Sequence, residues 1–121
     1  MDWEPATESE IKDYVLESYA RMTPEQRRLW DVMKIPPQKW TEYEYGSEGG
    51  GFWVVAVIGN SVIWFNDIEE GFNRSLFSEF GKIGDYWCNQ DELEHQVQNV
   101  AYQLREESDS ADVCDDLQDG A

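Results

Sequence analysis

Residues 52–66 read FWVVAVIGNSVIWFN, two apolar segments separated by Gly59-Asn60. Gly and Asn tolerate the backbone angles of a two-residue hairpin turn, and the flanking segments are rich in residues that favour strands. The pattern therefore predicts a β-hairpin with strands at 52–58 and 61–66.

The turn also sets a register for this hairpin. Counting outward from the turn, Val57 faces Val62 and Val55 faces Trp64. One face of the hairpin is then expected to carry Phe52, Val54, Ala56, Ile58, Ile63 and Phe65, and the other Trp53, Val55, Val57, Val62 and Trp64. Because both faces are apolar, we expect the hairpin at the centre of a sheet. That sheet is covered on both sides, or covered on one side and left as a binding surface on the other.

Two helices are expected before the hairpin. Thr7 and Thr23 are each followed three residues later by Glu or Gln, which is the spacing of a capping box. The apolar residues of 7–22 recur at helical spacing, so this segment is expected to form the first helix. The second helix must end at Pro36-Pro37, because proline lacks the amide donor and clashes with the preceding turn.

The remaining elements complete an α+β fold. Residues 39–45 and 72–80 are expected to be the first and fourth strands of a four-stranded antiparallel meander. Residues 89–105 carry an apolar stripe at helical spacing, which predicts a C-terminal helix packed on the sheet. Residues 1–105 should then form a single domain. Residues 106–121 hold seven acidic residues and no basic one, and are expected to be a disordered acidic tail.

Charge excludes several classes of function. The chain has 26 acidic and 9 basic residues among 121, a formal net charge of −17. Such a chain is repelled by nucleic acid and by anionic membrane surfaces, so direct binding to either is not expected. The start of the chain, Met1-Asp2, shows no basic and apolar leader, and the only cysteines are Cys88 and Cys114. We therefore expect a cytoplasmic protein.

No motif for catalysis, metal binding or cofactor binding is found. Cys88 and His95, the only thiol–imidazole combination, are expected to lie about 10 Å apart along a helix, beyond hydrogen-bond reach. The tail acids lack the ligand spacing of a calcium-binding loop. The Gly-rich segment 46–51 lacks the Lys and Ser/Thr of a phosphate-binding loop. We expect no catalytic residues, no metal ligands and no cofactor.

Topology predicts where acidic groups gather. In a meander, alternate connections lie at the same end, so loops 46–51 and 67–71 should be neighbours, and the last helix should release its tail beside them. A single negative pole is expected there. The candidate partner-binding residues are Glu48, Asp67, Glu69 and Glu70 at this pole, with Asp85, Tyr86 and Trp87 on the next loop.

These features favour a small acidic binding or inhibitory protein that acts without catalysis. Its expected partner is a basic protein, such as a nuclease toxin or a nucleic-acid-binding protein, because complementary charge speeds encounter and rejects wrong partners. An immunity protein that neutralises a bacterial toxin fits this description, and so does a protein that mimics DNA. The alternative is an interaction or scaffold domain, or a homodimer formed through an apolar face of the sheet.

Overall fold

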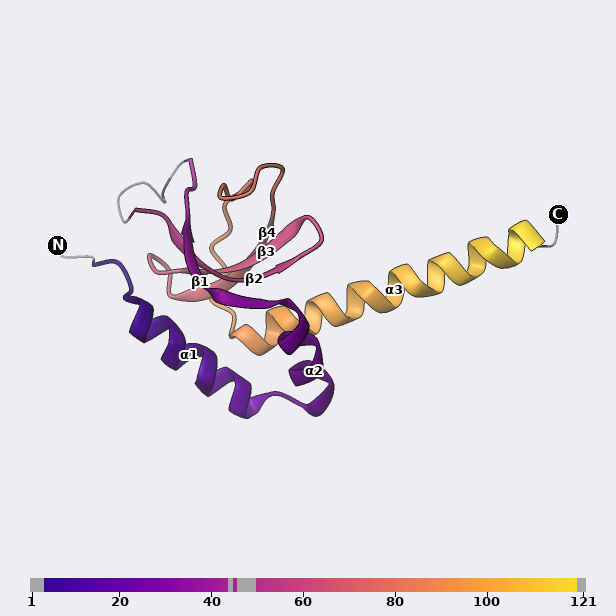
Figure 1. The fold of residues 1–121 in the computed structure, drawn as a ribbon, viewed down its shortest axis with the longest axis horizontal. Helices are drawn as coiled ribbons and strands as arrows, with labels where there is room; N and C mark the ends of the chain where they lie inside the picture. The colour runs from indigo at the N-terminus through magenta and orange to yellow at the C-terminus, as the bar shows by residue number, and fades with distance from the viewer. Residues whose placement is uncertain (1–3, 44, 46–49, 120–121) are drawn as a thin grey trace.

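The computed structural model describes residues 4–43, 45 and 50–119, with side chains described as far as Glu106. The described elements are α1 (Glu8–Arg21), α2 (Pro24–Met33), β1 (Lys34–Trp40), β2 (Phe52–Ile58), β3 (Ser61–Asn66), β4 (Gly71–Leu76) and α3 (Leu93–Asp119). The strands form one antiparallel sheet in the order β1-β2-β3-β4. The three helices lie on one side of it (Figure 1). The α+β meander expected from the sequence is confirmed.

Both N-terminal helices begin at the expected capping boxes. Thr7 Oγ1 accepts from Glu10 N at 3.1 Å, and Thr7 N donates to Glu10 Oε1 at 2.9 Å. Thr23 and Gln26 form the same reciprocal pair at 3.1 and 2.9 Å. The exchange satisfies amide groups that a helix start leaves without partners.

The first strand lies earlier in the chain than 39–45, so that boundary is wrong. β1 follows α2 directly and contains Pro36-Pro37. The prolines fit there because β1 is an edge strand. The pairing between β1 and β2 also shifts in register between Lys34 and Gln38, the interval that holds the prolines. The proline pair thus ends α2 as expected, but the chain continues as a strand.

The hairpin forms as expected, but its register is only half right. Val57 pairs with Val62, whereas Trp64 pairs with Val54 and not with Val55. A bulge between Val54 and Ala56 adds one residue to β2. Because side chains alternate along a strand, one extra residue reverses the orientation of everything before it.

The bulge corrects the predicted faces. Phe52 and Val54 join Val62 and Trp64 on the face away from the helices. Trp53 and Val55 turn toward the helices and pack with Ile63. The face assignments after the bulge are confirmed, and those before it are wrong.

The second face of the sheet is covered by the connection between β4 and α3. β4 ends at Leu76, short of the expected 72–80. Ile83 N then donates to Thr41 O at 2.8 Å, and Gly84 N donates to Leu76 O at 2.9 Å. Two consecutive residues therefore bridge the ends of the two edge strands, which requires a strongly coiled sheet. The buried cluster on this face of the sheet consists of Trp40, Phe52, Val54, Val62, Trp64 and, from the bridge itself, Ile83.

The last helix runs in the opposite direction to the one expected. Phe72 N donates to Asp91 O at 2.9 Å, so the connection returns along β4 before α3 begins at Leu93. α3 passes the Gly59-Asn60 turn, because Val100 of α3 lines the same hollow as these two turn residues. The tail therefore leaves the body at the end opposite to the 67–70 turn, and the expectation that it joins the acidic loops there is wrong.

The backbone of α3 continues through Asp119 and projects beyond the body (Figure 1). The disordered state expected for 106–121 stays a prediction. Among the described residues, no helix is both long enough and apolar enough to cross a membrane.

Ending the chain at Arg105 should leave the melting temperature within about 2 °C of the full-length value. The segment removed projects from the body, and its acidic groups oppose the negative end of the helix dipole. Thermal melting followed by circular dichroism measures this. Val97→Ala, in the fully buried stripe of α3, is the positive control and should melt far lower. A large drop on truncation would show that the segment packs on the body.

Gly84→Ala should lower the free energy of unfolding by about 1–3 kcal/mol. A Cβ at Gly84 would lie 2.5 Å from Leu76 O, the acceptor of the hydrogen bond that closes the bridge. Urea unfolding measures the change. Gly59→Asn is the control, because nothing lies within 4 Å of a Cβ there and Asn tolerates its φ of 59°. Equal stability of Gly84→Ala and wild type would mean that the bridge is not essential.

Candidate partner-binding surface

A buried amide positions most of the candidate residues. Asn66 is fully buried at the end of β3. Its Oδ1 accepts from Ile68 N and Glu69 N at 3.0 and 3.1 Å, which shapes the 67–70 turn. Its Nδ2 donates to Tyr86 Oη and to Trp87 O, both at 2.9 Å. One side chain thus fixes both the acidic turn and the aromatic loop.

The structure separates the acidic candidates. Glu48 lies outside the described residues. Glu69 and Glu70 are exposed on the turn. Asp67 is only 8 % exposed, and its Oδ2 accepts from Ala6 N at 2.9 Å. Asp67 therefore anchors the segment that leads into α1, which limits its reach toward a partner.

The aromatic loop lies against the covered face and the β4 edge. The Tyr86 ring is half-buried beside Phe52 and Trp64, with ring centroids at 6.1 and 6.0 Å. Trp87 is 49 % exposed, and its Nε1 donates to Asp85 Oδ2 at 2.8 Å. Asp85 Oδ1 accepts from Leu76 N at 3.1 Å. Asp85 and Trp87 thus form an exposed pair toward the Gly59-Asn60 end, separate from the acidic turn.

A groove at the turn brings together acidic groups that are distant in the sequence. It has a volume of about 290 Å³ and lies between α1, the 67–70 turn and the start of α3. Its aromatic and acidic lining residues include Tyr14, Glu17, Phe65, Glu70, Phe72 and Glu92. We call it the acidic groove.

Glu70 adopts a left-handed backbone conformation, with φ at 58°. This conformation costs a residue such as Glu about 1–2 kcal/mol relative to ordinary backbone angles. Neither Glu70 nor Glu17 forms an ion pair with a residue that the structure describes. Two exposed carboxylates therefore line the groove without an ion pair among the described residues, and the only basic residue in the described lining is Arg21, which interacts electrostatically with Glu17.

Tyr14 lines the groove, close to several carboxylates. Its ring packs on Phe65, with centroids 5.2 Å apart. Burial raises the pKa of Tyr14, and the carboxylates of Glu10, Glu70 and Glu17 raise it further. Ionisation of the phenol is therefore opposed first by burial and then by three nearby negative charges.

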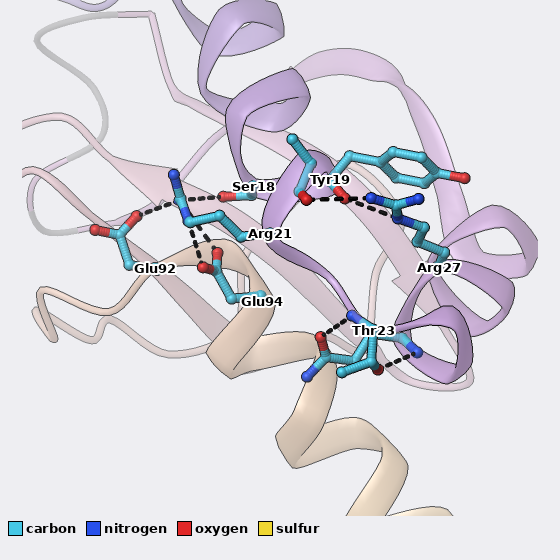
Figure 2. Close-up of polar contacts among 9 residues, drawn as sticks. Ser18, Tyr19, Arg21, Thr23, Arg27, Glu92 and Glu94 are labelled. Carbon is cyan, nitrogen blue, oxygen red and sulfur yellow. Dashed lines mark hydrogen bonds and ion pairs between the residues drawn. The ribbon is translucent and has the colours of Figure 1, made fainter.

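Arg21 lies at the rim of the groove and is held by carboxylates of the connection and α3. Its guanidinium donates to Glu94 at 2.6 Å, to Glu92 at 3.0 Å and to Ser18 at 3.1 Å (Figure 2). Burial opposes ionisation of Glu94, but the bonds from Arg21 and its other donors outweigh burial and lower its pKa. The positive charge of Arg21 is therefore satisfied internally.

Sequence reasoning missed the contributions to this surface of α1 and of the residues just before α3. Tyr14 and Glu17 are three residues apart, and Glu10 precedes Tyr14 by four, so they share a helix face. That spacing was a usable signal. Their position beside Glu70 depends on tertiary packing, which spacing alone does not give.

The described residues include no cluster of metal-ligating type. No group of three or more His, Cys, Asp or Glu among them is arranged to hold a metal ion. The acidic groove offers carboxylates and aromatic rings, which are groups that can bind guanidinium or ammonium cations.

No protein-family model matches this chain, and no curated protein and no solved structure is significantly similar to it.

The free energy of unfolding of Asp67→Asn should increase relative to that of wild type as the pH rises from about 3.5 to about 7. Burial raises the pKa of Asp67, although Ala6 N, its own backbone amide and Lys39 act in the opposite direction. A raised folded-state pKa gives stability below the unfolded-state pKa that is lost as the pH rises through the folded value. Asn does not titrate, so it avoids this loss. Urea unfolding of both proteins across this range measures the difference, and a constant or opposite trend would contradict the prediction.

Proposed function

We propose that this chain is a small acidic protein that binds and neutralises a basic protein partner without catalysis. The observation that carries the proposal is the acidic groove, in which Glu17 and Glu70 lie beside Tyr14 and form no ion pair with a residue that the structure describes. A basic side chain of a partner would meet carboxylates and an aromatic ring in one hollow. The net charge of −17 would speed the encounter.

The partner class follows from the same chemistry. Proteins that bind nucleic acid carry basic surfaces, and carboxylates placed on such a surface occupy the positions of phosphates. A nuclease toxin or another nucleic-acid-binding protein is therefore the proposed partner, in the manner of an immunity protein or a DNA mimic. We also propose a cytoplasmic location. The exposed free thiol of Cys88 supports it, because exposed thiols persist in reducing compartments.

The alternative function is an interaction domain or a homodimer. The second face of the sheet gives it little support, because Trp40, Phe52 and Trp64 are buried there. An apolar groove of about 590 Å³ between α1, α2 and β1 supports it better. Leu16, which lines this groove, is 68 % exposed. Binding through this groove would persist at high salt.

The test is affinity capture on the immobilised full-length chain at about 0.05 M and at about 0.5 M salt. Basic proteins should be retained at low salt and released at high salt. The double variant Glu17→Gln/Glu70→Asn should bind the captured protein about tenfold more weakly. Titration calorimetry or surface plasmon resonance measures the affinities.

The matched control is Glu79→Gln/Glu106→Gln, which has the same net charge but removes exposed acids outside the acidic groove. It should weaken binding by less than about twofold. Equal weakening by both double variants would show that only net charge matters. Retention that survives high salt would favour the interaction-domain alternative.

A further inference from the structure

Within the described part of the chain, Arg74 differs from most basic residues in forming no hydrogen bond or ion pair through its side chain. Lys12, Arg21, Lys34, Lys82 and Arg105 form ion pairs with carboxylates, and Arg27 donates to the carbonyls of Tyr19 and Ala20. The side chain of Arg74 forms no hydrogen bond or ion pair with any residue that the structure describes. This is notable because the chain has 26 acidic residues and the Arg74 side chain is half-buried.

The fold holds Arg74 in a hollow surface. It lies on β4, and its cross-strand neighbour is the fully buried Ile63. Two hollows of about 210 and 310 Å³ share Arg74, Asn60 and Gln103 in their linings. Arg74 is therefore placed between the hairpin turn and α3, and it borders open space on two sides.

Trp87 and Asp85 border the larger hollow with Arg74. Each Asp85 oxygen already accepts a hydrogen bond, one from Leu76 N and one from the indole Nε1. This arrangement fixes the exposed indole, and Asp85 forms no ion pair with Arg74 although both line the hollow. The lining of the hollow thus includes the guanidinium of Arg74, the indole of Trp87 and the side-chain amide of Asn60.

We propose that Arg74 and Trp87 form a site for a carboxylate side chain, an Asp or Glu that lies among the basic residues of the partner; this rests on the proposed function. The guanidinium fork matches a carboxylate in a bidentate geometry, and the indole packs against the stem that carries it. The nearby Asp85 carboxylate favours a ligand whose acid is flanked by positive charge.

The overall charge selects against more highly charged anions. A phosphate carries up to two negative charges, whereas a carboxylate carries one. The repulsion from a body of net charge −17 is therefore greater for a phosphate. The site would bind one acidic side chain that lies on a basic surface. It would therefore favour a basic partner that carries this acidic residue over one that does not.

The first test uses two blocked pentapeptides, Lys-Lys-Glu-Lys-Lys and its twin with Gln at the centre, in calorimetric titrations at low salt. Arg74→Gln should weaken the Glu peptide about fivefold and leave the Gln peptide equal or slightly tighter. Arg28→Gln is the matched control, because Arg28 is exposed and the charge change is the same. It should not discriminate between the peptides. Equal behaviour of the two variants would overturn the site.

The second test separates the site from the proposed function. Propionate has a carboxylate and no positive charge, and is titrated while the Trp87 indole N–H is followed by NMR. A saturable shift of the indole N–H signal that Arg74→Gln abolishes supports the carboxylate site, whether or not the peptides bind. Failure of both peptides to bind would count against the proposed function only. A linear shift, or tighter binding of methyl phosphate than of propionate, would overturn the carboxylate site even if the peptides bind.

Thermal melting by circular dichroism verifies that each variant is folded. Arg74→Lys is the second variant, because it keeps the charge and the aliphatic stem but not the planar fork. It should retain binding of both peptides and lose part of the preference for Glu. Full retention of that preference would show that no bidentate contact forms.

Discussion

Buried amide side chains hold the irregular connection between β4 and α3 on the sheet. Asn66 bonds the backbone of the 67–70 turn and the carbonyl of Trp87. Asn73 exchanges hydrogen bonds with the backbone of Asn89, at 2.9 and 3.0 Å. Gln96 donates to Phe72 O at 3.0 Å and ties the first turns of α3 to β4. An irregular segment cannot satisfy its own polar backbone, so these amides supply the partners that a regular strand would find in a neighbour.

This arrangement answers a problem set by β3, whose residues are all buried. A strand buried on both sides needs two covers, and the three helices supply only one (Figure 1). The connection supplies the other, because it bonds to both Thr41 and Leu76 and contributes Ile83 to the buried cluster that contains Trp40 and Trp64. Exposed side chains on the connection, including Trp87, are therefore presented from a well-anchored segment.

The sequence predicted those parts of the fold that depend on local chemistry. The capping boxes at Thr7 and Thr23 and the turn at Gly59-Asn60 are decided by nearest neighbours, and all three are found. The bulge at Val55 and the return of the connection along β4 depend on contacts between distant segments. No periodicity encodes them, and each moved a group of residues to another face or end. Of the candidate site, the acidic turn and the aromatic loop were predicted, but their separation and the contribution of α1 were not.

In the proposed function, different charged groups would determine how fast a partner associates and which partner is selected. Most carboxylates act together as a diffuse negative field, which attracts any basic surface and gives speed without much selectivity. Selectivity requires groups that a wrong partner leaves unsatisfied. In the proposed function, Glu17 and Glu70 in the acidic groove would be such groups for a cation, and Arg74, which lines a hollow with Trp87, would be one for an acid. A basic protein lacking either counterpart would leave these charges unpaired at the interface, and charges desolvated without partners weaken binding more than their pairing strengthens it.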